Sequence, residues 1–286
     1  MDWKGGRRSS NVQDRRGMGV KAGGGIGIIG LIIILIGWFF GIDPRTMLGF
    51  VEGTQSITGG TQTTTTAPPK NDEQSQFVSV MLGSNEDFWN SELKRNGVHF
   101  RAPKLVLFSN QTQSACGIAS AQTGPFYCPA DQKIYIDLNF IRQMQRMGAT
   151  QHQKVAGNFA MAYVLAHEFG HHISNLIGIL PKAHQAMQHA NSKAEANRYS
   201  VALELQADCF AGVWAANLDK YHISITQADL QEGLRAANAV GDDHIMESAG
   251  HTVRPENFTH GSSEQRMKWF ITGLKSGNMN ACDTFK

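Results

Sequence analysis

The stretch Ala166-His-Glu-Phe-Gly-His-His172 decides how the rest of this sequence is interpreted. Within it, His167, Glu168 and His171 form an H-E-x-x-H pattern. On a helix, residues four positions apart lie on the same face, so the two imidazoles can converge on one metal ion. Glu168 follows the first histidine and can reach a metal-bound water as its general base. The pattern predicts a metal site with a catalytic base.

The residues around this pattern are typical of a helix. Asn158-Phe-Ala-Met-Ala-Tyr-Val-Leu-Ala166 is apolar and contains no proline. The apolar spacing continues through Ile173 and Ile177 to a stop at Gly178. We therefore expect one helix over 155–178 that carries both histidines.

A third ligand candidate lies on a second helical pattern over 192–218. Glu204 stands among apolar residues there, and a carboxylate in such a position is costly unless it is paired or bound to metal. A catalytic zinc site needs three protein ligands and one open position, and two histidines with a glutamate are a common set. Asp208 lies one turn later and is placed to accept the outer N–H of a ligand histidine. The alternative is that Glu204 and Asp208 line a solvated helix face.

At this point the chain resembles a known group. H-E-x-x-H followed by E-x-x-x-D on a later helix resembles the gluzincin metallopeptidases. The strings Ala166-His-Glu-Phe-Gly-His-His172, Glu204-Leu-Gln-Ala-Asp-Cys-Phe-Ala-Gly212 and Phe258-Thr-His-Gly-Ser-Ser-Glu-Gln-Arg266 are similar to the bacterial, membrane-anchored neutral zinc metallopeptidase family. The resemblance extends from the N-terminal anchor to the tail Cys282-Asp-Thr-Phe285. It therefore implies the family's properties for nearly the whole chain.

The resemblance assigns roles to individual residues. It implies one Zn²⁺ per chain, with His167, His171 and Glu204 as its ligands and Glu168 as the catalytic base. The domain is then expected to be zincin-like.

A late segment offers a further candidate. In gluzincins, a donor from a late segment stabilises the oxyanion of the tetrahedral intermediate. His260, in the loop Asn257-Phe-Thr-His-Gly-Ser262, or Arg266 could take that role in this chain. The alternative account of the loop is helix capping by Ser262 or Ser263.

The strand 133–137 and His172 can each be interpreted in two ways. In metallopeptidases of this shape an edge strand near the zinc pairs with the substrate backbone. Lys133-Ile-Tyr-Ile-Asp137 is the strand expected to do so, unless it is an ordinary strand with a covered edge. His172 points about 100° away from His171 on a helix, so we expect it behind the ligands or at the surface. The remaining histidines lack ligand spacing and are expected to be solvated: His99, His152, His184, His189, His222, His244 and His251.

Composition and charge indicate a membrane-attached protein. The chain has 286 residues and a net charge of +2, which gives no argument for binding nucleic acid. The basic residues near the start are Lys4, Arg7, Arg8, Arg15, Arg16 and Lys21. The uncharged apolar run Gly23–Ile42 follows and has the length that a bilayer core requires. Trp38, Phe39 and Phe40 resemble interfacial anchors at its far end.

The orientation of this run follows from its flanks. The positive-inside rule places the N-terminus in the cytoplasm and the chain after Asp43 in the periplasm or cell exterior. No small-x-small cleavage site follows Phe40, which favours an uncleaved anchor in the inner membrane over a signal peptide.

The sequence divides into four parts. We expect a basic cytoplasmic segment over 1–22, a transmembrane anchor over 23–42, a flexible Thr/Gly/Pro-rich tether over 43–76, and the zinc metallopeptidase domain over 77–286. Helices are predicted over 84–95, 155–178, 192–218, 226–240 and 263–274, and strands over 104–108 and 133–137. The predicted class is a helix-rich α+β domain with a small sheet, preceded by one transmembrane helix.

Four cysteines favour disulfides in an exported domain, although four cysteines allow three pairings. Cys116 and Cys128 bracket a predicted turn, so a local bridge is natural. Cys209 and Cys282 are then the remaining pair. A second metal site made of these thiols is disfavoured, because no C-x-x-C spacing occurs.

Together these features predict a membrane-anchored zinc metalloendopeptidase that hydrolyses peptide or protein substrates with a Glu168-activated water. The alternative is an anchored interaction module that zinc stabilises and that hydrolyses nothing. A glutamate in the base position argues against this alternative, because a purely structural metal needs no base.

Overall fold

The computed structural model describes residues 1–16, 72–120, 123–140 and 158–285. The predicted anchor over 23–42 and the tether up to residue 71 lie outside these described residues. Among the residues that are described, no helix is both long and apolar enough to cross a bilayer. The chain divides into two compact units, residues 1–15 with 67–286 and residues 16–66. Every element below belongs to the first unit.

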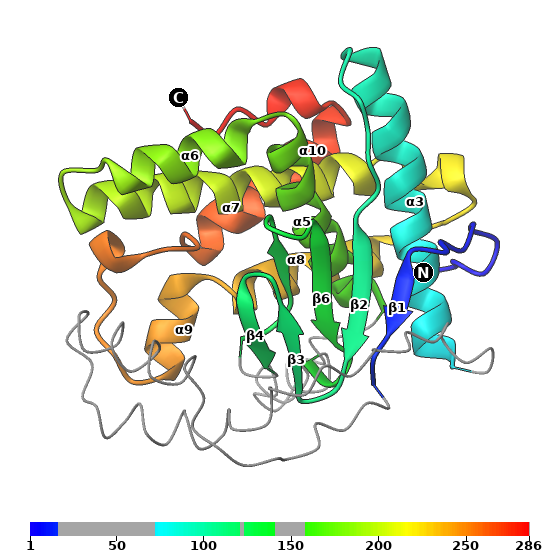
Figure 1. Cartoon of the computed structure of the whole chain (residues 1–286), viewed down its shortest axis with the longest axis horizontal. Helices are drawn as coiled ribbons and strands as arrows, with labels where there is room; N and C mark the ends of the chain where they lie inside the picture. Colours follow the sequence, from blue (N-terminus) through cyan, green and yellow to red (C-terminus); the bar gives the residue numbers. More distant parts are fainter. Residues whose placement is uncertain (17–71, 121–122, 141–157, 286) are drawn as a thin grey trace. The chain divides into compact units, whose positions relative to one another are not determined.

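A four-stranded sheet in the order β1-β2-β6-β5 forms one side of this unit (Figure 1). β1 (Val12–Asp14), β2 (Lys104–Phe108) and β6 (Lys133–Asp137) run parallel, and β5 (Phe126–Cys128) is antiparallel to β6. β2 and β6 have the predicted bounds. Both consist largely of buried residues, as expected for strands in the interior of a mostly parallel sheet.

The prediction that Lys133–Asp137 (β6) is an edge strand is wrong. β6 lies between β2 and β5, so the edge strands of this sheet, among the described strands, are β1 and β5. A run of three residues such as Phe126–Cys128 is too short to show strand periodicity, which is why this strand could not be predicted. A separate hairpin of β3 (Gln111–Ser114) and β4 (Gly117–Ser120) is joined to β5 by the predicted disulfide Cys116–Cys128.

Seven helices of the described part form the rest of the domain, which confirms the helix-rich α+β class. They are α3 (Glu73–Arg95), α5 (Asn158–Leu176), α6 (Ile179–Gln188), α7 (Lys193–Ala215), α8 (Gln227–Ala239), α9 (Asp242–Ser248) and α10 (Ser263–Ser276). Short 3-10 turns cover Leu218–Tyr221, Pro255–Asn257 and Met279–Ala281. α7 packs against both α5 and α10. α5 also contacts the sheet through β5 and β6.

The helix bounds follow from caps that the sequence contains. Ser192, Thr226 and Ser262 cap α7, α8 and α10, and the last two form capping boxes. α5 ends just before Gly178, which has a φ of 78°. α7 ends at Ala215, three residues before the predicted end.

The largest difference in the helices concerns α3. It begins at Glu73 instead of Ser84, because the Asp72 carboxylate caps it by accepting the N–H groups of Gln74 and Ser75. Ser84 lies inside the helix, where its hydroxyl donates to the carbonyl of Met81. Residues 73–76, which were assigned to the tether, are therefore helical.

The folded unit also contains the N-terminal residues 1–15, which were predicted to form a separate segment. Trp3 is buried in the hydrophobic core, and β1 pairs with β2. Figure 1 shows β1 at the edge of the sheet, beside β2 and close to α3. The domain is therefore larger than the predicted range 77–286.

Glycines allow the three central helices to approach one another closely. A Cβ on Gly170 would lie 2.9 Å from the backbone of Ala207, so this glycine brings α5 against α7. A Cβ on Gly273 of α10 would collide with the carbonyl oxygen of Cys209 on α7. Gly170 lies between Glu168 and His171, so the metal-binding pattern also contains the residue that brings the second helix within reach.

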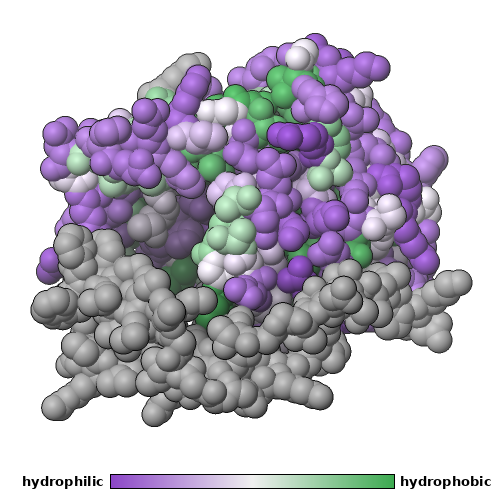
Figure 2. All heavy atoms as spheres, viewed as in Figure 1, coloured by the Kyte–Doolittle hydropathy of each residue, from purple (hydrophilic) through white to green (hydrophobic). Residues whose placement is uncertain are grey.

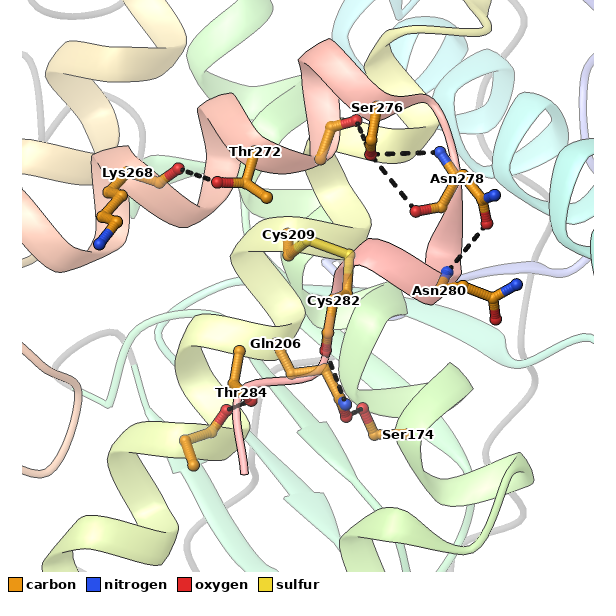
Figure 3. The surroundings of a disulfide bond; sticks show 12 residues. Ser174, Gln206, Cys209, Lys268, Thr272, Ser276, Asn278, Asn280, Cys282 and Thr284 are labelled. Atoms are coloured by element: carbon orange, nitrogen blue, oxygen red, sulfur yellow. Dashed lines mark hydrogen bonds between the residues drawn. A yellow bond between two sulfur atoms is a disulfide. The ribbon is translucent and has the colours of Figure 1, made fainter. Parts of the chain in front are cut away.

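The C-terminal tail fastens this helix layer. Cys282 forms the predicted disulfide with Cys209, and Figure 3 shows the tail crossing α7 at this point. The Gln206 amide donates to the Cys282 carbonyl at 3.3 Å, and its oxygen accepts from Ser174 of α5 at 2.6 Å. The tail thus ties α5 and α7 together close to the ligands. Elsewhere, the described surface is mainly hydrophilic in the view of Figure 2.

Candidate metal centre

The three predicted ligands come together at the contact of two helices. α5 presents His167 and His171 one turn apart, and α7 presents Glu204 from the opposite side. The Nε2 atoms of the two histidines lie 3.2 Å apart. A carboxylate oxygen of Glu204 lies 3.2 Å from Nε2 of His167, and the other lies 3.4 Å from Nε2 of His171. Among the described residues, this is the group that could hold a metal ion.

The spacing of these atoms suits zinc. Ligands about 2.1 Å from a tetrahedral zinc ion stand about 3.4 Å from one another. The two Nε2 atoms, 3.2 Å apart, are close to that spacing, and each of them has one of the two Glu204 oxygens at a similar distance. Two imidazole nitrogens and one carboxylate would hold the ion, and this group of described residues contains no fourth ligand. The donor set fits a catalytic zinc site.

Asp208 fixes the orientation of the first ligand. Its carboxylate is fully buried and lies 2.8 Å from Nδ1 of His167. Because Nδ1 donates to this carboxylate, Nε2 is left as the metal-binding nitrogen. The Tyr163 hydroxyl donates to the same carboxylate oxygen at 2.5 Å. The predicted role of Asp208 behind the ligand thus agrees with its contacts.

Arg266 neutralises this buried carboxylate. Its Nε donates to Asp208 at 2.8 Å, and one terminal nitrogen donates to Asp208 at 3.1 Å. The other terminal nitrogen donates to the Val240 carbonyl. Burial disfavours the charged form of Asp208, but Arg266 and His167 outweigh it and lower the pKa of Asp208 to about 2. These contacts favour a positioning role for Arg266, and its role as an oxyanion donor stays a prediction.

Glu168 lies between the two histidines in the sequence and lines the cleft beside them. Its side chain is buried, and this burial raises its pKa above the usual value for a glutamate. A carboxylate with a raised pKa accepts protons more readily near neutral pH. The position and the environment of Glu168 are those that a general base requires.

A cleft of about 770 Å³ opens over the ligands. Apolar residues form much of its lining, among them Phe126, Leu180 and Leu203. His184 of α6 is exposed, as predicted, and it also lines the cleft. The space is large enough for a segment of a peptide beside the metal position.

His260 reaches the same cleft from the loop before α10. Its Nδ1 lies 3.0 Å from a carboxylate oxygen of Asp242. The other oxygen of Asp242 accepts the backbone N–H groups of Thr259, His260 and Gly261 at 2.7, 2.6 and 3.0 Å. The hydrogen bond to Asp242 raises the pKa of His260 above its usual value. Asp242 therefore holds both the loop and the imidazole in place.

His172 has a different place from the two ligands beside it. It is fully buried, which excludes the surface position that we considered. Its Nε2 must donate to the carbonyl of Arg101 at 2.6 Å, so Nδ1 accepts the Tyr127 hydroxyl at 3.0 Å. Burial lowers the pKa of His172 to about 4, which agrees with this neutral form. Asn175 donates to the same hydroxyl. These bonds fasten the edge strand β5 to the ligand-bearing helix.

Three residues of the site were not found from the sequence. Tyr163 stands one turn before His167, and this spacing was a usable signal for a partner on the same face. Asp242 had no such signal, because 18 residues separate it from His260. His184 lies on α6, a helix that the sequence analysis did not predict. Only the fold brings Asp242 to His260 and His184 to the cleft.

Comparison with known proteins identifies the family of this chain. The model of a family described as "Putative neutral zinc metallopeptidase" matches residues 1–285, and the chain belongs to this family. The chain is 41% identical over 297 residues to the uncharacterized protein YpfJ of Escherichia coli K12, with 100% of this chain and 99% of the relative covered. It is 43% identical over 195 residues to the uncharacterized protein Rv2575 of Mycobacterium tuberculosis H37Rv, which covers 65% of this chain and 63% of the relative. No solved structure matches the chain significantly.

Proposed function

We propose that this protein is a zinc metalloendopeptidase attached to a membrane. The observation that carries the proposal is the convergence of His167, His171 and Glu204 next to Glu168 in one cleft. A structural zinc site closes its coordination with a fourth protein ligand, whereas three ligands and an open cleft are typical of a catalytic site. The proposed fold within the α+β class is zincin-like.

Glu168 is the proton carrier of the proposed reaction. A bound zinc ion would supply Lewis-acid chemistry, which makes a water molecule more acidic and a carbonyl carbon more electrophilic. Glu168 accepts the proton of the attacking water and returns it to the leaving amine. Burial raises the pKa of Glu168 above the usual value for a glutamate, which favours uptake of the proton from the attacking water.

His260 is the proposed oxyanion donor. Nδ1 donates to Asp242, so Nε2 can donate toward the cleft when the imidazole is protonated. A donor that lines the same cleft can stabilise the negative oxygen as it forms. Arg266 serves this step indirectly, since its buried guanidinium fixes Asp208 and thereby His167.

The peptide substrate is proposed to lie along β5. Phe126 and Tyr127 of this edge strand line the cleft, and an extended peptide can add to a sheet edge through backbone hydrogen bonds. Leu180 and Leu203 offer apolar surface to a substrate side chain.

The proposed location is outside the cytoplasm, in the periplasm or at the cell exterior, with attachment to the inner membrane through residues 23–42. The disulfides Cys116–Cys128 and Cys209–Cys282 support this location, because disulfides persist in oxidising compartments.

A digest of a peptide library tests the proposed activity. The full chain, purified in detergent, should cleave internal peptide bonds, lose this activity with a zinc chelator, and regain it when zinc is restored. Absence of cleavage by the zinc-loaded protein across a broad library would contradict the proposal and favour an interaction module.

A further inference from the structure

The first sixteen residues of the chain make specific contacts with α3, β2 and the turn after α7. We call residues 1–16 the N-terminal arm. We propose that this arm is a built-in part of the domain, so that the arm and residues 72–285 occupy the same side of the membrane. A single span between residues 22 and 43 would separate them. The inference concerns topology and does not depend on peptidase activity.

The arm completes the sheet. Val12, Gln13 and Asp14 of β1 pair with Leu105, Val106 and Leu107 of β2 in a parallel register. The N–H of Leu105 donates to the Asn11 carbonyl at 2.9 Å, and the N–H of Arg15 donates to the Leu107 carbonyl at 2.7 Å. Without the arm, the apolar strand β2 would become an open edge.

α3 is shaped to receive the arm. Ser9 and Ser79 hold each other through two hydrogen bonds, one from the Ser9 N–H to the Ser79 carbonyl at 3.0 Å and one from the Ser79 hydroxyl to the Ser9 carbonyl at 2.8 Å. A Cβ on Gly83 would collide with the carbonyl oxygen of Arg7. The helix therefore has a glycine where the arm backbone crosses it.

A buried carboxylate of α3 takes its partners from the arm. Glu86 is only 6% exposed and accepts hydrogen bonds from Arg7 at 2.7 Å, Ser9 at 2.7 Å and Asn11 at 2.8 Å. A buried carboxylate is costly without such partners. Three arm residues thus satisfy one acidic group of the domain.

The start of the arm is anchored on the opposite side of α3. Trp3 is buried, and its ring meets that of Phe77 edge-on at 5.3 Å between centroids. Asp2 and Ser224 exchange two backbone hydrogen bonds of 2.9 Å each. The arm therefore joins segments that lie far apart in the sequence.

These contacts give the basic residues near the start a structural role. Arg7 pairs with Glu86 and Asp87, Arg8 donates to Gln76, and Lys4 lies 3.8 Å from Glu73. The charge asymmetry used to orient the apolar run therefore serves docking onto the domain. Because hydrogen bonds of 3 Å cannot form across a hydrocarbon layer about 30 Å thick, the arm and the domain share one compartment.

A zero-length crosslink tests the docking directly. Lys4 Nζ and a carboxylate oxygen of Glu73 lie 3.8 Å apart, and both side chains are exposed. A carbodiimide applied to opened membranes that contain the full chain should join Lys4 to Glu73, as detected by peptide mass spectrometry. The Glu73→Gln variant should lose this product. The pair Lys133 and Asp131, at 3.6 Å within the domain, is the internal control. Formation of the control crosslink without the Lys4 product in the wild-type chain would overturn the proposal.

Cysteine labelling in cells tests the shared compartment. Single substitutions Lys4→Cys in the arm and Lys268→Cys on α10 place thiols at exposed positions, and the four native cysteines are paired in disulfides. A membrane-impermeant thiol reagent should label both variants under the same conditions, either in intact cells or only after the inner membrane is opened. Labelling of one variant in intact cells and of the other only after opening would refute the inference.

Discussion

The two walls of the cleft are held in different ways. The long helices α5 and α7 form one wall, which we call the helix wall. Its side chains His167 of α5 and Asp208 of α7 are 8% and 0% exposed. The loop before α10, residues 257–262, forms the other wall, which we call the loop wall. Its His260 side chain is 50% exposed and is held by Asp242. The buried network holds the three ligand side chains close enough together to share one metal ion. The loop wall instead presents an accessible donor to the space where a substrate would lie.

This difference separates two functions of the site. Changes on the helix wall should alter how tightly zinc is held, and changes on the loop wall should alter turnover at full zinc occupancy. The zinc content and the rate of each variant, measured side by side, can confirm or break this division.

Glu204→Ala should have the largest effect. It removes one of three ligands, so we expect loss of bound zinc and a fall in peptide hydrolysis of roughly a thousandfold or more. This fall exceeds the roughly 10- to 100-fold loss expected when a residue that hydrogen-bonds a ligand, such as Asp208, is replaced. Metal analysis of the purified protein checks this. Glu264→Ala, at an exposed position of α10, is the matched control and should retain both zinc and activity. Full zinc in the Glu204 variant would remove this residue from the ligand set.

His260→Ala should lower kcat by roughly 100- to 1000-fold and leave the zinc content unchanged, because it removes one oxyanion donor. His251→Ala changes an exposed histidine away from the cleft and should behave as the wild type. An equal loss of zinc or of folded protein in the His260 variant would assign the loop a structural role instead.

Asp208→Asn should weaken zinc binding by roughly 10- to 100-fold, as measured by competition with a chromogenic chelator. The substitution keeps the size of the side chain but removes the charge that orients His167 and pairs Arg266. An uncompensated buried guanidinium should also lower the unfolding free energy by roughly 3–5 kcal/mol. Unchanged zinc affinity would show that the two helices hold His167 without Asp208.

Asp242→Asn should shift the pH profile of kcat. Asp242 raises the pKa of His260, with a smaller contribution from the charge of Glu204, while burial and Arg266 act in the opposite direction. Nδ1 donates to Asp242, so only the protonated ring can also donate from Nε2. The protonated form persists to higher pH when the pKa is raised, and activity is lost as the pH rises through that value. In the variant, we therefore expect the alkaline fall of kcat to begin at lower pH. An unshifted profile would exclude this coupling.

The smallest expected difference between the two walls is in the contributions of the two disulfides to the free energy of unfolding. Cys209–Cys282 closes a loop over 73 residues on the helix wall, and Cys116–Cys128 closes one over 12 residues beside β5. Chain entropy predicts losses of about 4 and about 3 kcal/mol in unfolding free energy when each pair is replaced by serines. Denaturant titration measures both losses. The longer bridge should affect zinc retention and the shorter one KM, and the reverse assignment would contradict the division of the walls.

The helix wall could be predicted because the sequence signals for its residues lie within single helices. The spacing of His167 and His171, the position of Glu204 in an apolar stretch, and the caps at Ser192 and Thr226 lie within single helices. Strands β2 and β6 were equally clear, since each is a run of five residues with strong β-propensity.

Features that depend on distant contacts could not be predicted. β1 has three residues and becomes a strand only by pairing with β2, about 90 positions later. The basic charges around it were taken as an orientation signal, although Arg7 binds Glu86 in the fold. β5 and Asp242 were missed for the same reason, since their roles arise only when the fold brings them to β6 and His260.

The central claim is that Glu168 acts as the base beside a zinc ion, and Glu168→Gln tests it most directly. This change keeps both histidines, Glu204 and the helix, so the variant should bind about one equivalent of zinc, as the wild type does. Its hydrolysis of a peptide that the wild type cleaves should fall by roughly 100- to 10,000-fold, because the water loses its proton acceptor and the leaving amine its donor. Zinc-loaded Glu168→Gln protein that cleaves the same peptide at the wild-type rate would contradict the account.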